Sequence, residues 1–183
     1  YWPQLCLIQV YDGKEEVIID PLEKELDLSS FIKILNNKKI IKVIHAGRQD
    51  IEIFFNLTKK IPQNIFDTQI AAMVCGFGDS IGYESLVSQL LRKKIDKTSR
   101  FTNWLNRPLS KKQLNYAISD VTHLFNIYPI IHEKIMQNKR VNWLKEEMEI
   151  LTSKKTYELN PDNSWKRLKI RSLIKSQLEF LQN

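Results

Sequence analysis

Cysteine is nearly absent from this 183-residue sequence, which contains only Cys6 and Cys75. Two cysteines form neither a disulfide framework nor a zinc-binding pattern. Both stand among apolar residues, in the segments LCLIQV and AAMVCGF. We therefore expect two buried free thiols in a protein of a reducing compartment, the cytoplasm.

Long apolar runs are missing as well. No stretch approaches the roughly 18 consecutive apolar residues that a membrane span needs, so we expect no association with a membrane. The first residues, YWPQ, lack the basic leader and the cleavage site of a signal peptide. They also lack an initiator methionine and run directly into a β-rich segment, which is typical of a piece of a longer protein.

Several familiar catalytic motifs do not occur. The sequence contains no GKS or GKT phosphate loop, no GxGxxG, no GxSxG and no HExxH. The usual signatures of nucleotide-binding proteins, serine hydrolases and zinc proteases are thereby excluded. Carboxylate chemistry with hard divalent cations remains open.

Positive charge is present in excess. The 28 lysines and arginines against 21 aspartates and glutamates give a formal net charge of +7 and a pI of about 9.3. This balance favours a polyanionic partner such as a nucleic acid, although lysine-rich surfaces also occur on proteins that bind none. The content of 43% hydrophobic residues is that of a globular protein rather than a disordered one.

The first part of the chain alternates strand and helix, which predicts an α/β domain. Segments 4–11 and 15–20 flank Asp12-Gly13 and are predicted to form a hairpin. The elements expected next are a helix at 28–37, a strand at 40–46, a helix at 49–58, a strand at 64–67 and a helix at 68–75. Helices are then expected at 83–91, 110–118, 120–138 and 140–155, with an irregular segment at 92–108. Ser29 or Ser30 is expected to cap the first helix, and Ser110 the helix that follows it.

Three side chains are candidates for carboxylate chemistry. Asp50 follows strand 40–46 after a turn, where α/β sheets place their sites, although it could simply complement the helix dipole. Tyr116 and Asp120 are spaced i, i+4 and share one helix face. This pair suits a site in which the carboxylate holds a metal and the phenol orients a water. Alternatively, Tyr116 packs in the core with its hydroxyl bonded to Asp120.

Two further residues invite a structural interpretation first. Asp67 ends a strand and precedes Thr-Gln, so a helix N-cap is its simplest role. His45 ends an apolar strand, where a hydrogen-bonded core histidine is favoured over a ligand or a general base.

The irregular segment 96–109 (DKTSRFTNWLNRPL) combines basic and aromatic residues. Lys97, Arg100 and Arg107 alternate with Phe101 and Trp104, a combination that can bind phosphates and stack bases. The alternative is a loop that pins Trp104 into the core while its basic side chains stay solvated.

Taken in order, the motifs resemble the ribonuclease D family. The matching stretches are 1–9 (YWPQLCLIQ), 45–52 (HAGRQDIE), 66–72 (FDTQIAA), 96–97 (DK), 104–110 (WLNRPLS) and 116–121 (YAISDV). The resemblance runs from residue 1 to about residue 135. That family belongs to the DEDD superfamily of 3′→5′ exonucleases, and Tyr116 resembles the residue that defines its tyrosine subclass.

The resemblance implies an RNase H-like mixed β-sheet flanked by helices. It also implies hydrolysis of RNA phosphodiesters from the 3′ end by two divalent cations, Mg²⁺ or Mn²⁺. The expected substrates are tRNA precursors or other stable RNA. The implied roles are metal binding for Asp50 and Asp120, water orientation for Tyr116, RNA contacts for Lys97, Arg100, Trp104 and Arg107, and support for His45 and Asp67.

The first motif of that family, Asp-Thr-Glu, has no counterpart here, because no Asp-x-Glu occurs on an expected strand. The resemblance places its strand centrally, so we expect a slot between the hairpin and strand 40–46. We expect the 183 residues alone to fold poorly, to be inactive, or both. The alternatives are a catalytically inactive RNA-binding remnant and a purely partner-binding fragment.

The resemblance also suggests a division of the chain. Residues 1–138 are expected to form the exonuclease domain without its first motif, and residues 139–163 a connecting helix and linker. Residues 164–183 are expected to begin a helical accessory domain of the type shared with RecQ helicases.

Overall fold

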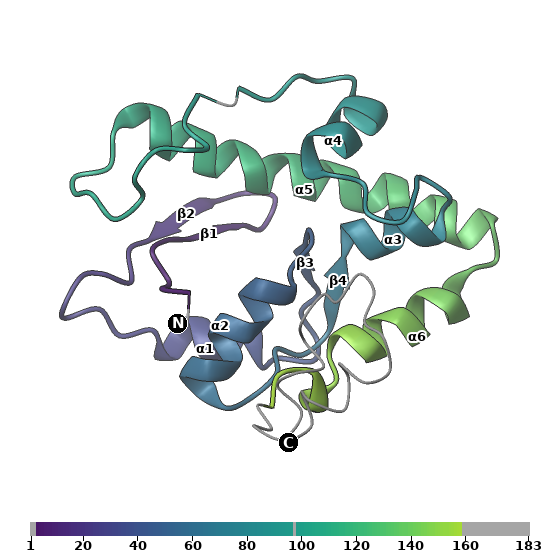
Figure 1. The fold of residues 1–183 in the computed structure, drawn as a ribbon, viewed down its shortest axis with the longest axis horizontal. Coiled ribbons are helices and arrows are strands. Elements are labelled where there is room, and N and C mark those ends of the chain that lie inside the picture. Colours follow the sequence, from purple (N-terminus) through teal and green to yellow (C-terminus); the bar gives the residue numbers. More distant parts are fainter. Residues whose placement is uncertain (1–2, 97, 159–183) are drawn as a thin grey trace, which may run out of the picture.

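The computed structural model describes residues 3–96 and 98–158, and Figure 1 shows their arrangement. The elements in chain order are β1 (Ile8–Tyr11), β2 (Glu16–Ile19), α1 (Ser29–Leu35), β3 (Lys42–Ile44), α2 (Arg48–Thr58), β4 (Ile65–Asp67), α3 (Thr68–Val74), α4 (Tyr83–Leu91), α5 (Lys111–Gln137), α6 (Val141–Leu151) and the short 3₁₀ helix η1 (Lys154–Thr156). None of the helices in these ranges is long and apolar enough to cross a bilayer.

The predicted hairpin is confirmed. β1 and β2 pair antiparallel, with Ile8 opposite Ile19. The Asp12 side chain accepts hydrogen bonds from the backbone amides of Lys14 and Glu15, both at 2.8 Å. Together with the positive φ of the following glycine, these bonds close the turn.

β3 and β4 pair parallel, with Val43 opposite Phe66, and α2 makes the connection between them. In the described part of the chain these strands form one two-stranded sheet and the hairpin forms another. The expected single mixed sheet is therefore divided, because no described strand joins β1 to β3.

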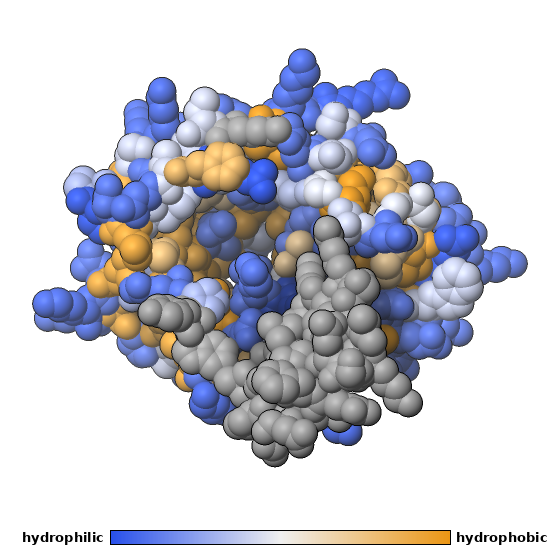
Figure 2. Space-filling model, in the orientation of Figure 1, coloured by the Kyte–Doolittle hydropathy of each residue, from blue (hydrophilic) through white to orange (hydrophobic). Residues whose placement is uncertain are grey.

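A cavity of about 1030 Å³ lies between the two sheets. Its lining includes residues 8–11 of β1 and 42–44 of β3, with apolar side chains of α1, α2 and α5 around them. It lies where the sequence analysis expects a slot. Figure 2 shows the hollow near the middle of one face, partly surrounded by apolar residues.

The largest core lies beneath α3, α4 and α5. Ala71, Leu86, Ile127 and Ile131 are fully buried there. The two helices expected at 110–118 and 120–138 are a single 27-residue helix, α5, because its apolar face continues without interruption. The predicted cap of this helix is confirmed, since Ser110 and Gln113 form a capping box. The cap expected at Ser29 or Ser30 is wrong: α1 starts without a side-chain cap, and Ser29 donates to Asp27 instead.

α6 packs against the body of the molecule. Leu151 and the following Tyr157 belong to a second core cluster with Ile51 and Phe55 of α2. The first part of the segment 139–163, expected to be a connection, is thus integrated into the fold. Residues 159–183, which include the expected basic segment 164–183, lie outside the described residues. Both cysteines are free but half-buried rather than buried.

Candidate active site

Asp67 organises the backbone around the proposed site. The side chain is 1% exposed. It accepts hydrogen bonds from the amides of Gln69 at 2.8 Å and Ile70 at 3.4 Å, which confirms the predicted N-cap of α3. It also accepts from the amides of Ala46 at 3.1 Å and Gly47 at 2.8 Å. One buried carboxylate therefore joins the start of α3 to the turn between β3 and α2.

That turn is tightly determined. Ala46 has a φ of +52°, and a Cβ at Gly47 would collide with the side chain of Ile44. α2 begins directly afterwards and carries Asp50 in its first turn. The turn thus fixes which way the Asp50 carboxylate leaves the helix.

His45 is a hydrogen-bonded histidine beneath this turn. Its Nδ1 lies 2.9 Å from the hydroxyl of Thr68, and its ring packs against Tyr83 with 5.3 Å between the centroids. Burial lowers the pKa of His45, and the charge of Asp67 only partly opposes this. The imidazole is therefore neutral at neutral pH, which agrees with a supporting role.

We expect replacement of Asp67 by Ala to be among the most destabilising single changes in this part of the fold. It would leave four backbone amides without their acceptor, at a cost of about 3 kcal/mol or more. Urea unfolding of the whole protein measures the change. Asp79→Ala, at an exposed carboxylate, is the control and should lie within about 0.5 kcal/mol of the unchanged protein. Equal effects of the two substitutions would contradict the assigned role of Asp67.

Tyr116 and Asp120 share one face of α5, and the Tyr116 hydroxyl hydrogen-bonds the Asp120 carboxyl. Oδ1 of Asp120 is buried and has no hydrogen-bond partner in the described residues. Burial raises the pKa of Asp120 to about 6, although Tyr116 and the positive charge of Arg100 oppose the shift. The Tyr83 hydroxyl anchors this part of α5, because it donates to the Asp120 backbone carbonyl at 2.5 Å. The sequence analysis did not single out Tyr83, since only the tertiary fold brings it there.

Asp50, Tyr116 and Asp120 all line the large cavity. A smaller cavity of about 280 Å³ also brings Asp50 and Tyr116 together, here with Trp104 and the segment 4–9. The Asp50 carboxylate is reached by water through these cavities, yet the protein around it raises its pKa, and the charge of Asp67 adds to the effect. The three side chains that the sequence singled out therefore meet at one hollow.

This donor set suits a hard divalent cation, but it is only part of a site. Oxygen ligands are what Mg²⁺ and Mn²⁺ prefer, and the unpartnered Asp120 Oδ1 needs a positive partner in its buried position. In residues 3–96 and 98–158 no group of three or more acidic, histidine or cysteine side chains lies close enough to hold a metal. The two carboxylates fit a metal centre that further ligands would have to complete.

The residues expected to contact RNA have different positions. Arg100 is exposed, lines the large cavity and lies over the ring of Phe101 at 5.3 Å. Phe101 itself is 87% exposed, as a base-stacking side chain would be. Trp104 is half-buried against Tyr116, with 6.1 Å between the ring centroids. Lys97 lies outside the described residues.

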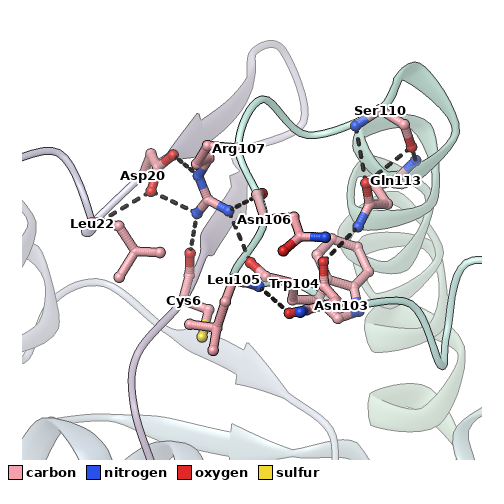
Figure 3. Close-up of polar contacts among 10 residues, drawn as sticks. All are labelled: Cys6, Asp20, Leu22, Asn103, Trp104, Leu105, Asn106, Arg107, Ser110 and Gln113. Carbon is pink, nitrogen blue, oxygen red and sulfur yellow. Dashed lines mark hydrogen bonds and ion pairs between the residues drawn. The ribbon is translucent and has the colours of Figure 1, made fainter.

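Arg107 is committed inside the protein, which corrects its expected role as an RNA contact. Its five N–H groups donate to the Asp20 carboxylate and to the carbonyl oxygens of Cys6, Trp104 and Asn106 (Figure 3). None of its donors is left for a phosphate.

Comparisons with known proteins agree with this arrangement. A family profile described as 3′-5′ exonuclease matches residues 1–136. Ribonuclease D of Bartonella henselae is 45% identical over 182 residues, covering 100% of this chain and 45% of the relative. Ribonuclease D of Nitrobacter hamburgensis is 47% identical over 171 residues, covering 93% and 45%. The chain thus spans somewhat less than half the length of these curated relatives.

Solved structures show the same fold. The crystal structure of Escherichia coli RNase D, described as an exoribonuclease involved in structured RNA processing, matches with a TM-score of 0.84 and 34% identity over 91% of this chain and 44% of that chain. Brucella melitensis NrnC with bound Mg²⁺ matches with a TM-score of 0.76 and 24% identity over 93% of this chain and 83% of that chain. The latter likeness concerns the fold alone.

Proposed function

Since the chain belongs to the 3′-5′ exonuclease family and is a homologue of ribonuclease D, we propose that the whole protein hydrolyses RNA phosphodiesters from the 3′ end. The observation that carries the proposal is the convergence of Asp50, Tyr116 and Asp120 on one cavity. Precursors of tRNA or other stable RNA are the proposed substrates, in line with the printed role of the Escherichia coli relative in structured RNA processing.

The proposed chemistry divides the work among these residues. Asp50 and Asp120 bind two divalent cations, Mg²⁺ or Mn²⁺, which when bound supply a hydroxide nucleophile and neutralise charge on the leaving oxygen. Tyr116 orients the attacking water through its hydroxyl, which the Asp120 carboxyl holds. Arg100 at the cavity wall attracts the RNA backbone, and Trp104 bounds the space beside Tyr116.

We propose that a further strand fills the large cavity and supplies the remaining carboxylates. β1 and β3 each have one strand edge without a partner among the described residues, and both line the cavity. Unpaired ladder groups are costly unless another strand or water satisfies them. A strand between them would bring its own acidic side chains to the end where Asp50 lies.

The proposed division of the chain follows the resemblance. Residues 1–138 form the exonuclease domain, with α6 packed onto it, and residues 139–163 lead away from it. Residues 164–183 begin a basic accessory domain that assists RNA binding, where Lys166, Arg167 and Lys169 are among the positive charges.

The direct test uses RNA labelled at either end and the whole protein. A 5′ label is expected to give a ladder of shortened RNA, and a 3′ label to be released at once as mononucleotide. Both should require Mg²⁺ or Mn²⁺ and stop when EDTA is added. An RNA blocked at its 3′ end by phosphate is the control and should resist digestion. Cleavage inside the blocked RNA would contradict an exonuclease.

A second candidate function is an RNA-binding remnant without catalysis. It is favoured by the observation that only two carboxylates come together at the described part of the site. Such a protein would bind RNA with an affinity that is indifferent to Mg²⁺ and would leave both labels intact.

A further inference from the structure

Arg107 joins three segments that are distant in the sequence. Its guanidinium makes a two-pronged ion pair with Asp20, which follows β2, and donates to the Cys6 carbonyl at 2.8 Å, just before β1. The same group donates to the Trp104 carbonyl at 2.8 Å and to the Asn106 carbonyl at 2.9 Å within its own loop. The hairpin and the loop are therefore held against each other by one side chain.

The other side of this loop is held by α5. Gln113 donates to the Thr102 hydroxyl at 3.1 Å and to the Asn103 carbonyl at 3.3 Å, while it takes part in the capping box with Ser110. Figure 3 shows Trp104 between the Arg107 contacts and the Gln113 contacts. The backbone of residues 102–107 is thus fastened at both ends, with the tryptophan in the middle.

Trp104 faces the residues proposed for the reaction. It packs against Tyr116 and, with Cys6, Asp50 and Tyr116, lines the cavity of about 280 Å³. Arg107 does not line this cavity, but it bonds two of the residues that do, Cys6 and Trp104. The width of the cavity beside Tyr116 therefore depends on Arg107.

We propose that Arg107 is a positioning residue for the proposed exonuclease reaction: together with Asp20 it holds Trp104 against Tyr116 and so fixes the hydroxyl that orients water. The proposal rests on the proposed function for its catalytic consequence, but not for its geometry. Lysine cannot replace Arg107, because an ammonium group has three donors and cannot match the planar five-donor pattern.

The kinetic test compares Arg107→Gln, Arg107→Lys and Asp20→Asn in the whole protein. A displaced catalytic group costs up to about 100-fold, so we expect kcat to fall about 10- to 100-fold in both Arg107 variants while KM stays within about threefold. Arg92→Gln, an exposed arginine before the same loop, is the matched control and should keep the parental kcat. A rise in KM with unchanged kcat would make Arg107 an RNA contact and overturn the proposal.

A double-substitution cycle separates positioning from general support. Asp20→Asn and Trp104→Ala alter side chains whose only described link is Arg107. If the clamp acts through Trp104, Asp20→Asn lowers kcat in the parent but not in the Trp104→Ala background. Independent, multiplicative losses, or a lower thermal midpoint with parental kcat, would overturn the proposal.

A readout without turnover keeps the clamp testable even if no RNA is cleaved. In protein labelled with 5-fluorotryptophan, the ¹⁹F signal of Trp104 is assigned by its loss in Trp104→Phe. In Arg107→Gln this signal alone should move toward the position of solvent-exposed tryptophan. An unmoved Trp104 signal would refute the clamp, whereas absence of cleavage by the parent would refute only the proposed function.

Discussion

Replacing Asp120 by Asn is expected to reduce RNA shortening by the whole protein by about 1000-fold or more, while RNA affinity changes no more than a few-fold. Asn keeps the shape of the side chain and its contact with Tyr116, but it removes the negative charge that would hold a cation. Single-turnover digestion of labelled RNA and a separate binding titration measure the two effects. Undiminished turnover would remove Asp120 from the site.

The same substitution should act on stability in the opposite direction when metal is absent. The folded-state pKa of Asp120, about 6, lies above the value of about 3.9 for an unfolded chain, so the folded state holds the proton more tightly. The ionised carboxylate therefore costs stability above pH 6, and the cost disappears as the pH falls toward 4.

In EDTA at pH 7.5, Asp120→Asn is thus expected to unfold a few degrees higher than the parent, equivalent to about 1–2 kcal/mol after allowance for partial solvation. Thermal unfolding at several pH values measures this difference, which should shrink between pH 6 and pH 4. Mg²⁺ should raise the midpoint of the parent only. Asp79→Asn, at an exposed carboxylate, is the control and should show neither effect.

The second large effect concerns the cavity between the two sheets. A protein of residues 1–183 alone is expected to retain less than about 0.1% of the turnover of the whole protein, because only two of the proposed metal-binding carboxylates are within it. It should also unfold at lower denaturant concentration, since Ile34, Ile40, Ile41 and Phe125 are all more than 40% exposed at the cavity lining.

The digestion assay and urea unfolding, run side by side on both proteins, measure these losses. Hydrogen exchange adds a local readout, because a strand that pairs with β1 and β3 should slow amide exchange along their free edges in the whole protein only. Equal activity of the two proteins would show that Asp50 and Asp120 suffice and that the cavity needs no strand.

Much of the local structure was predictable because short-range chemistry determines it. The Asp12-Gly13 turn, the Ser110 cap and the Asp67 cap each depend on residues within three positions. The convergence of Asp50 with Tyr116 and Asp120 was expected only through the family resemblance, since no local pattern relates α2 to α5. Spacing alone left a structural role for each of them open.

What the sequence could not provide were long-range partners. Arg107 has the composition and neighbours of an RNA contact, and its true partner, Asp20, lies 87 positions away. The second use of the Asp67 carboxylate, on the amides of Ala46 and Gly47, is likewise invisible without the parallel pairing of β3 and β4. The join between the two helices expected around residue 119 was misplaced because polar residues on the exposed face of α5 look like a boundary.

The length of α5 separates two mechanical duties. Its second half is anchored by Ile127, Ile131 and Ile135, which are almost completely buried, whereas its first half carries Tyr116 and Asp120 beside a water-filled hollow. Pro129 stands between them and deprives the Phe125 carbonyl of its intrahelical donor, which makes bending easiest at that point. The reactive end can therefore adjust to an incoming strand or substrate by a small pivot, while the buried end keeps its packing.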